Sequence, residues 1–442
     1  MEKTLLSDIA AYCSGTLHGQ DVYIEGVTTD TRNMHPGDLF VPLIGERFDA
    51  HDFLPRAAEV CAAVLSGRDC DLGVPVVRVA DTGDALLAIA GAYRRRFRIP
   101  LAAVTGSTGK TTTKQMLASI LSRRFETVFT QGNYNNHVGV PLTLLRLAPS
   151  TGAAVVEMGM NHFGEISRLT AAAAPTAAVI TNIGSMHLEF LGSREGILKA
   201  KCEIFEGLSP DGTAVLNADD DMLRTLEGRL PFRTVWYGID SPAAQFRAAD
   251  AEERQDSTSF TLKTPRGDRR VTLPMAGIHN VMDALAASAA AMVCGAGPDD
   301  VRAGLESAVN TGGRQRTFAH GEYTVIDDCY NAGPDSVRAA LSVLSKAPGR
   351  RVAVLGSMLE LGSVSGREHV LAAQEARQAA DLVFLFGEEM EPAALPGEHY
   401  ATREELAEAL RAAVRPGDTI LFKGSRGMHM EKVLSMFMEG RS

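Results

Sequence analysis

The feature that most constrains this chain is the stretch T-G-S-T-G-K-T-T-T, which occupies residues 105–113. It follows an apolar run at residues 99–104 and opens a segment typical of a helix, so it joins a predicted strand to a predicted helix. Its two glycines allow a tight turn that directs backbone N–H groups at phosphate oxygens, and the helix N-terminus adds positive potential. Lys110 can reach the outer phosphates, and the Thr111 hydroxyl a magnesium ion. The sequence therefore predicts a phosphate-binding loop.

The spacing of this loop departs from the common pattern. Val104 stands where most such loops have a glycine, so the loop is the shortened form G-S-T-G-K-T. The alternative is an ordinary Gly/Ser/Thr turn that caps a helix. The strand, the lysine and the three threonines in order favour the phosphate-binding interpretation.

Length and composition exclude several classes of protein. A chain of 442 residues that is 45% hydrophobic is long enough for two or three globular domains. A formal charge of -10 argues against a nucleic-acid partner, and the one basic cluster, R-R-R-F-R at 94–98, is interpreted as a solvated helix end. No stretch has the length of a membrane span or the apolar core of a signal peptide. Six scattered cysteines without a C-x-x-C pair indicate reduced thiols, so we expect a cytoplasmic protein.

The order of the apolar runs predicts an α/β fold. Residues 1–82 mix short strands and turns with a helix near 54–64, and residues 83–98 form a connecting helix. Strands and helices alternate over 99–310, which predicts a central parallel sheet, with hairpin-like strands near 258–274. Residues 311–442 repeat the alternation as a Rossmann-like domain that lacks G-x-G-x-x-G.

Three further side chains are expected at the same sheet edge as the loop. Glu157 ends a buried strand, where a carboxylate suits magnesium, although it could simply cap the strand in solvent. His187 follows the next strand, although a lone histidine is often structural. Lys199 and Lys201 lie on one helix and point about 200° apart, so at most one faces the site, and both could lie on a solvated face.

Motifs in register along nearly the whole chain resemble the Mur ligase family. They are T-T-D-T-R at 28–32, G-D-L-F-V-P-L-I-G-E-R-F-D-A-H-D-F at 37–53, the shortened phosphate loop, G-N-Y-N-N-H-V-G-V-P-L-T-L-L at 132–145, V-E-M-G-M-N-H-F-G-E-I at 156–166, T-N-I-G-S-M-H-L-E at 181–189, A-K-C-E-I-F at 200–205, G-I-H-N, G-G-R, D-D-C-Y-N-A-G-P-D-S and F-K-G-S-R. The pattern is most similar to members that add D-alanyl-D-alanine to UDP-N-acetylmuramoyl tripeptide.

The resemblance implies a three-domain Mur ligase architecture: a UDP-sugar-binding N-terminal domain, a central P-loop ATPase domain with a parallel sheet, and a C-terminal Rossmann-like domain. It also implies a reaction of the cytoplasmic stage of peptidoglycan synthesis. The tripeptide carboxylate attacks the γ-phosphate of ATP to give an acyl phosphate, and the amine of D-alanyl-D-alanine then displaces phosphate. Such an enzyme is expected to act as a monomer, without nucleic acid or membrane insertion.

The resemblance further implies roles for individual residues. Lys110, His187 and Lys201 are the expected catalytic residues, and two magnesium ions are expected on Thr111, Glu157, His187 and Lys201, the last as a carbamylated lysine. The expected ATP contacts are Thr105, Gly106, Ser107, Thr108, Gly109, Lys110, Thr111, Thr112, Asn280, Arg314 and Asp328. The expected contacts of the other substrates are Thr29, Asp30, Arg32, Asp49, His51, Asn133, Asn136, Lys423 and Ser425.

Several positions depart from the family pattern, and rival functions stay open. The departures are Ala50, Cys202, Asp283, Gly333 and Ser357, none of which is an expected metal ligand. The rivals are the ligase that adds the third amino acid, a folylpolyglutamate synthetase, and a nucleotide-dependent switch. The absence of D-N-P-R argues against the first, and the N-terminal domain against the second. Hinges near residues 98 and 311 are expected to close the domains, and the third residue of the acceptor peptide stays open.

Overall fold

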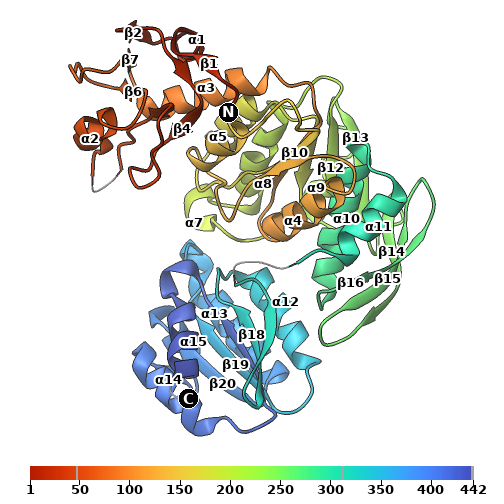
Figure 1. Ribbon diagram of the computed structural model, residues 1–442. Coiled ribbons are helices and arrows are strands. Elements are labelled where there is room, and N and C mark those ends of the chain that lie inside the picture. Colours follow the sequence, from red (N-terminus) through yellow and green to blue (C-terminus); the bar gives the residue numbers. More distant parts are fainter. Residues whose placement is uncertain (46–47, 310–312, 440–442) are drawn as a thin grey trace.

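The computed structural model describes residues 1–45, 48–309 and 313–439, and in Figure 1 these form an N-terminal part, a central part and a C-terminal part. The strands of the described residues form sheets of two, five, nine and six strands. The N-terminal and C-terminal parts lie on different sides of the central one (Figure 1). No helix among the described residues is long and apolar enough to cross a membrane.

The N-terminal part is built on a five-stranded sheet in the order β2-β7-β6-β5-β4. The strands are β2 (Thr16–His18), β4 (Gly26–Thr28), β5 (Asp38–Phe40), β6 (Ala63–Ser66) and β7 (Val76–Arg78), and a small pair is made by β1 (Thr4–Leu5) and β3 (Tyr23–Ile24). Its helices are α1 (Leu6–Tyr12), η1 (Ala50–Phe53) and α2 (Leu54–Ala58). The helix expected near 54–64 was therefore too long. Residues 63–66 are instead a fully buried strand between β5 and β7, because pairing within the sheet outweighs the helix preference of alanine.

The connecting helix α3 (Thr82–Arg94) begins at Asp81, whose carboxylate accepts a hydrogen bond from the N–H of Asp84. It ends at Arg94 rather than at residue 98. The interpretation of the whole basic cluster as a solvated helix end was wrong, because the Arg94 side chain is buried. Its guanidinium donates to the carbonyl oxygens of Ala173, Phe97 and Ile99, so it fastens the end of α3 to the central part.

The central sheet has the order β16-β15-β14-β13-β12-β11-β8-β10-β9. Its parallel strands are β8 (Leu101–Thr105), β9 (Thr127–Phe129), β10 (Ala153–Glu157), β11 (Ala177–Ile180), β12 (Thr213–Asn217), β13 (Arg233–Gly238) and β14 (Phe246–Glu253), followed by the antiparallel β15 (Thr258–Lys263) and β16 (Arg269–Leu273). Glu157 pairs with Val104, and Ile180 with Thr105. The phosphate loop, Glu157 and the segment after β11 therefore leave the sheet at one edge.

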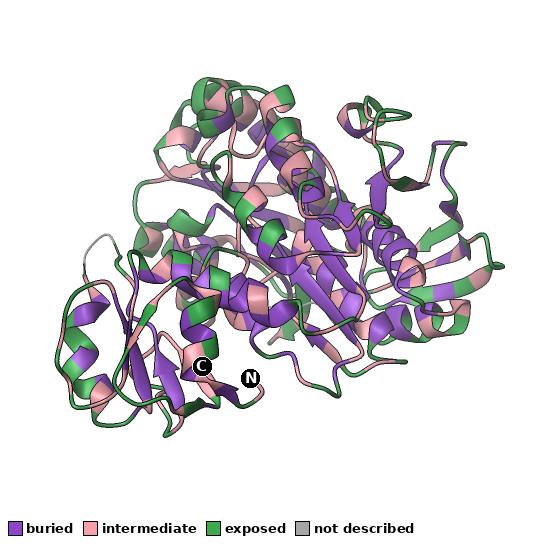
Figure 2. Ribbon diagram, turned by 90° about the horizontal axis from the view of Figure 1, so that it is seen from above, coloured by how far each residue is buried: buried purple, intermediate pink, exposed green. Residues whose placement is uncertain are grey.

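Helices cover both faces of this sheet, and Figure 2 shows its strands as buried. One face packs on α4 (Lys110–Leu121), α10 (Ile278–Val293) and α11 (Pro298–Glu306), and the other on α3, α5 (Gly139–Leu144), α6 (Glu165–Ala173) and α8 (Arg194–Cys202). The short elements α7 (Leu188–Leu191), η2 (Glu203–Phe205) and α9 (Asp221–Arg224) complete this part. Burial on both faces explains why its strands are continuous apolar runs rather than alternating ones.

The C-terminal part is a six-stranded sheet in the order β17-β18-β22-β19-β20-β21, in which only β17 is antiparallel. The strands are β17 (Arg316–His320), β18 (Tyr323–Asp328), β19 (Arg351–Gly356), β20 (Leu382–Phe386), β21 (His399–Tyr400) and β22 (Thr419–Lys423). The helices α12 (Pro334–Ser345) and α13 (Ser365–Ala379) cover one face, and α14 (Arg403–Ala413) and α15 (Met430–Glu439) the other, with short turns η3 (Gly362–Val364), η4 (Glu388–Ala393) and η5 (Arg426–Met428). This is the expected Rossmann-like alternation. The expected boundary and hinge at 310–311 lie outside the described residues.

Candidate functional site

A large cavity of about 1570 Å³ lies between the central and C-terminal parts. The central part contributes the phosphate loop and the segments that follow β10 and β11, and the C-terminal part contributes the ends of β18 and β22 and the start of α12. Fifteen of the expected site residues line it, namely Ser107, Thr108, Gly109, Lys110, Thr111, Thr112, Asn133, Asn136, Glu157, His187, Lys201, Asn280, Arg314, Asp328 and Lys423. The expected residues outside its lining are Thr105, Gly106, Thr29, Asp30, Arg32, Asp49, His51 and Ser425.

The phosphate loop has the backbone that the sequence predicts. Gly109 has a φ of 75°, and a Cβ there would overlap the carboxyl group of Asp283. Gly106 has a φ of 149°, and a Cβ there would overlap Thr181. Close packing and a positive φ therefore both require glycine at these two positions. Lys110 folds back so that its Nζ donates to the carbonyl oxygens of Gly106 (2.7 Å) and Ser107 (3.0 Å).

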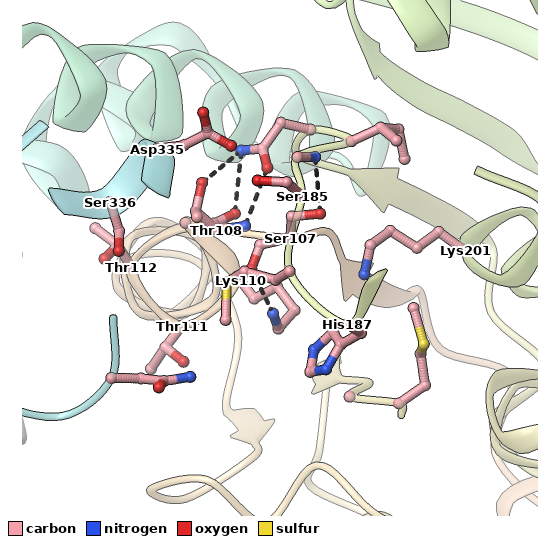
Figure 3. Close-up of a pocket in the computed structure, with 18 of the residues that line it drawn as sticks. Ser107, Thr108, Lys110, Thr111, Thr112, Ser185, His187, Lys201, Asp335 and Ser336 are labelled. Carbon is pink, nitrogen blue, oxygen red and sulfur yellow. Dashed lines mark hydrogen bonds between the residues drawn. The ribbon is translucent and has the colours of Figure 1, made fainter. Parts of the chain in front are cut away.

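The first half of the loop is already hydrogen-bonded within the protein, as the dashed lines in Figure 3 show. The N–H groups of Ser107 and Thr108 donate to the backbone oxygen and the side-chain oxygen of Asn182, at 3.0 Å each. By contrast, no acceptor within the described residues takes the N–H groups of Gly109, Lys110 and Thr111. The groups that can meet a phosphate therefore begin at Gly109, at the N-terminus of α4.

Glu157 is buried at the end of β10 and held from two sides. Its Oε1 accepts a hydrogen bond from Asn135 Nδ2 at 2.8 Å, and Lys114 Nζ lies 3.6 Å from its Oε2. Oε2 has no hydrogen-bond partner within the described residues. Lys114 is itself completely buried, its Nζ donates to the carbonyl of Gly132, and burial lowers its pKa.

The donor set fits a hard divalent cation that shares its ligands with a phosphate. Glu157 Oε2 is a buried oxygen that accepts no hydrogen bond from the described residues, and Thr111 lines the same cavity. No group of three or more His, Cys, Asp or Glu within the described residues could hold a metal ion by itself. Magnesium commonly binds through one or two carboxylates plus phosphate oxygens and water, so a complete protein cage is not required.

Three basic side chains converge on the other side of the loop. Lys110, His187 and Lys201 lie together in Figure 3. Lys201 is buried, and no described residue accepts a hydrogen bond from its Nζ; burial, with the charge of Lys110, holds its pKa well below the usual value. Lys199 is exposed and lies over the ring of Phe163, so only one lysine of this helix reaches the site.

His187 stands on a left-handed backbone with a φ of 65°. Its Nδ1 lies 2.7 Å from Oε2 of Glu360, a residue of the C-terminal part. Burial lowers the pKa of His187, and the nearby charges of Lys201 and Lys110 lower it further. The histidine is therefore a neutral ring, which suits a metal ligand better than a general acid.

The remaining cavity wall is a chain of polar contacts. Asn280 Nδ2 donates to the carbonyl of Ala276 and to Gln315 Oε1, both at 2.7 Å. The Gln315 N–H donates to Asp328 Oδ1, and Lys423 Nζ lies 2.6 Å from Asp328 Oδ2. The Arg314 guanidinium lies 3.6 Å from the centre of the Tyr330 ring. This wall brings together Asn280 and Asp328, which are expected to contact ATP, and Lys423, which is expected near the dipeptide.

Two expected substrate contacts of this region have internal partners. Asn136 Oδ1 accepts hydrogen bonds from the N–H groups of Val138 and Gly139 at the start of α5. The Ser425 hydroxyl donates to the carbonyl of Ala332 and accepts from the N–H of Leu359. Both side chains shape the backbone around the cavity.

The expected N-terminal contacts lie away from the cavity. Arg32 makes a two-pronged ion pair with Asp30, which lowers the pKa of Asp30 to about 2. His51 Nδ1 lies 2.6 Å from Asp49 Oδ1, and its Nε2 accepts a hydrogen bond from the Gly67 N–H. Because both ring nitrogens are occupied, His51 fixes Asp49 and the loop at Gly67 rather than offering a free ring. Thr29 is half-buried beside Asp30.

Sequence reasoning missed four residues that organise the cavity: Lys114, Asn135, Gln315 and Glu360. Asn135 lies within the quoted G-N-Y-N-N-H motif, and Lys114 lies one helical turn after Lys110, so both had a positional signal. Gln315 and Glu360 had none, because their partners are distant in sequence.

The departures from the family pattern have distinct surroundings. Asp283 is buried beneath Gly109, and desolvation raises the pKa of its carboxyl well above the usual value. Gly333 lies against Met186, and Ser357 is buried at the end of β19. Burial raises the pKa of Cys202 to about 12. Ala50 begins η1, and nothing in the structure explains its exchange for glycine.

Taken together, the fold and this cavity define an α/β protein whose P-loop faces a Rossmann-like domain across a pocket lined by many charged side chains of both signs. The family model of the Mur ligase middle domain matches residues 104–291, and that of the Mur ligase, glutamate ligase domain, matches residues 313–426. The chain belongs to the Mur ligase family.

Similar proteins cover nearly the whole chain. The UDP-N-acetylmuramoyl-tripeptide–D-alanyl-D-alanine ligases of Escherichia coli and Bacillus subtilis are 40% and 38% identical to it, each over 99% of both chains. A crystal structure of MurF from Acinetobacter baumannii superposes with a TM-score of 0.93 at 36% identity over 99% of both chains. MurF from Thermotoga maritima in complex with ADP gives 0.84 at 28% identity, over 95% of this chain and 99% of that one.

Proposed function

We propose that this chain is the ATP-dependent ligase that joins D-alanyl-D-alanine to UDP-N-acetylmuramoyl tripeptide in peptidoglycan synthesis. The relatives of that name match it over 99% of both chains. The observation that carries the proposal is the cavity lined by the phosphate loop, the buried Glu157 and Lys201, whose Nζ finds no hydrogen-bond acceptor among the described residues. Such a site neutralises a transferring phosphoryl group and needs no nucleophilic side chain.

ATP would bind with its phosphates at the start of α4. The unpaired N–H groups of Gly109, Lys110 and Thr111 supply donors, and Lys110 would exchange its two carbonyl partners for phosphate oxygens. We place the adenosine along the wall that holds Asn280, Arg314 and Asp328. Thr105 and Gly106 would act through the shape of the loop, because neither lines the cavity.

Two magnesium sites form part of this proposal. Glu157 Oε2 and the Thr111 hydroxyl would hold the first ion, and His187 and a modified Lys201 the second. When bound, magnesium supplies positive charge to the phosphate oxygens. Lys201 has the properties that carbamylation needs, since its amine is buried, unpaired and of lowered pKa. The neutral nitrogen attacks the carbon of carbon dioxide, a proton leaves, and the carbamate oxygens become anionic donors.

In the proposed reaction, the peptide carboxylate attacks the γ-phosphorus and ADP leaves. The amine of D-alanyl-D-alanine then attacks the acyl carbon of the resulting acyl phosphate, a proton leaves the nitrogen, and phosphate departs. Lys110 would hold the phosphoryl oxygens, His187 would act through the second magnesium ion, and the cavity between the domains would keep water from the acyl phosphate.

We assign the other substrates by the position of each group. The UDP-sugar would lie on the N-terminal part near Thr29, Asp30 and Arg32, with Asp49 held in place by His51. The incoming dipeptide would lie near Lys423, with Ser425 shaping the backbone beside it. Asn133 reaches the cavity directly, whereas Asn136 fixes its loop.

Three further assignments belong to the same proposal. We divide the chain into domains at residues 1–82, 99–310 and 311–442, with the connecting helix at 83–98. The protein would act as a monomer, because one chain carries every group assigned here. It would act in the cytoplasm, where ATP is available and where its six free cysteines stay reduced.

The test is phosphate release from ATP with UDP-N-acetylmuramoyl tripeptide, with and without D-alanyl-D-alanine, followed by mass detection of the product. We expect release that needs both substrates and yields the pentapeptide. Tripeptides ending in lysine and in diaminopimelate should be compared. Amide formation with a single amino acid would indicate a sister ligase, and ATP turnover without any amide would indicate a nucleotide-dependent switch.

A further inference from the structure

The contact between His187 and Glu360 joins the central part to the C-terminal part across the cavity. The two residues are 173 positions apart in sequence, and His187 Nδ1 lies 2.7 Å from Glu360 Oε2. The backbone repeats the contact, because the N–H of Glu189 donates to the carbonyl of Glu360 at 3.4 Å. Gly362 packs so closely that a Cβ there would lie 3.1 Å from the Cα of Glu189. The segments at 187–189 and 360–362 therefore fit each other through backbone and side chain.

Both partners hold an unfavourable backbone conformation. His187 has a φ of 65° and Glu360 a φ of 64°, and only seven non-glycine residues of the described chain have positive φ. Two of the seven meet in this one contact. A non-glycine residue keeps a positive φ only where the surrounding structure enforces it. Residues with such strained backbone conformations cluster at functional sites.

The contact also determines which nitrogen of the ring is free. A carboxylate can only accept, so the Nδ1 of His187 carries the proton and donates it to Glu360. A neutral imidazole ring carries a single N–H. Nε2 is then the unprotonated nitrogen, which is the form that binds a metal ion or accepts a hydrogen bond.

We propose that Glu360 is a positioning residue that couples the approach of the C-terminal domain to the completion of the histidine side of the site. While the domains are together, its carboxylate holds His187 in the Nδ1–H tautomer and presents Nε2 to the ligand. When they separate, the ring loses this partner and its fixed orientation. The inference rests on the proposed function, because it takes His187 to be a ligand of the second magnesium ion.

The first test observes the ring itself. In the full-length protein labelled with ¹⁵N-histidine, with His187→Gln used to assign the signal, we expect the Nδ1–H tautomer for the parent. Glu360→Ala should give a mixture of tautomers, and Glu360→Gln, which keeps an acceptor oxygen, should restore part of the parent signal. The exposed Glu388 of the same domain supplies the control Glu388→Gln, which should match the parent.

The second test counts manganese ions bound beside a non-hydrolysable ATP analogue by electron paramagnetic resonance. Removing the partner of a ligating histidine lowers metal affinity by about 10- to 100-fold, so Glu360→Ala should weaken the second manganese by that factor. The manganese affinity of Glu360→Gln should lie between those of Glu360→Ala and the parent. In a protein that already carries His187→Ala, adding Glu360→Ala should lower the manganese affinity no further.

The inference is overturned if Glu360→Ala keeps both the parent tautomer and the parent manganese affinity, or if the parent binds a single manganese ion. Neither result excludes amide formation by the parent, although a single manganese ion would also remove the second metal site from the proposed function. If the proposed function itself is wrong, the parent protein will form no amide.

Discussion

At the scale of single residues, the site depends on buried ionisable side chains whose pKa values are shifted by their surroundings. Lys201 is buried, no acceptor for its Nζ lies in the part of the chain that the structure describes, and burial lowers its pKa, so at neutral pH more of its amine is uncharged than in an exposed lysine. Only the uncharged amine reacts with carbon dioxide. We expect the parent to lose activity in buffer freed of carbon dioxide and to regain it with bicarbonate. Lys201→Arg should be inactive under both conditions, and full activity of the depleted parent would contradict the carbamate.

Asp283 provides a prediction about pH. Its folded-state pKa is raised, so the folded protein binds this proton more tightly than the unfolded chain does. The stability that the proton provides is complete below the unfolded pKa near 3.9 and is lost as the pH rises towards the folded pKa. Asp283→Asn should therefore stabilise the protein at pH 7, by about 1.4 kcal/mol for each unit by which the folded pKa is raised up to that pH, and the gain should vanish near pH 4. Urea unfolding across this pH range measures it, and a gain independent of pH would show that Asp283 keeps an ordinary pKa.

The buried pair of Lys114 and Glu157 can be tested by removing one partner. Both side chains are buried, and their charged atoms lie 3.6 Å apart. Lys114→Met leaves Glu157 buried without a cation and should cost about 3–5 kcal/mol of the free energy of unfolding. Lys114→Met combined with Glu157→Gln should recover a large part of that loss. Additive losses in the double variant would show that the two residues do not interact.

At the scale of elements, two separate requirements fix Gly109 of the phosphate loop: its backbone conformation and the close packing around it. The motif predicts that Gly109 must adopt a positive φ, but not that the Asp283 carboxyl lies directly against it. Gly109→Ala should therefore suffer both strain and overlap, and should lower the affinity for ADP at least tenfold. In Gly109→Ala combined with Asp283→Ala the overlap is absent and only the strain remains, so affinity should return in part, as calorimetry can measure. Equal affinities of the parent and Gly109→Ala would exclude both effects.

The sequence predicts helices and strands well where a long hydrophobic pattern lies within one segment. It predicts them poorly where contacts with distant segments determine the structure. The helix over Arg403–Ala413 and the parallel core of the central sheet follow from periodicity and apolar runs. The strand at Ala63–Ser66 and the burial of Arg94 do not, because sheet pairing and distant carbonyl oxygens determine them. The same holds for the site. Lys110, Glu157 and Lys201 belong to motifs, whereas Gln315 and Glu360 are recognised only through partners in another domain.

At the scale of the whole molecule, the C-terminal domain touches the central one on two sides of the cavity. His187 meets Glu360 on one side, and on the other Lys346 Nζ lies 2.6 Å from Glu253 Oε1. The second pair is partly exposed, so it adds little stability by itself. The contacts between the two domains, which also include the hydrogen bond between Asn280 and Gln315, are small beside the cavity that they surround, so ligands can stabilise or release this arrangement.

We therefore expect the free protein to sample more open arrangements than the one described here. With a non-hydrolysable ATP analogue and UDP-N-acetylmuramoyl tripeptide together, small-angle scattering should show compaction to the profile of this structure, since closure buries charge that the ligands neutralise. Glu253→Gln should leave the liganded profile unchanged, because the exposed pair is a minor term. Glu360→Ala should shift the balance towards the open form at subsaturating ligand, because it removes a contact made only in the closed arrangement. Identical profiles of the parent with and without both ligands would contradict closure about the two hinges.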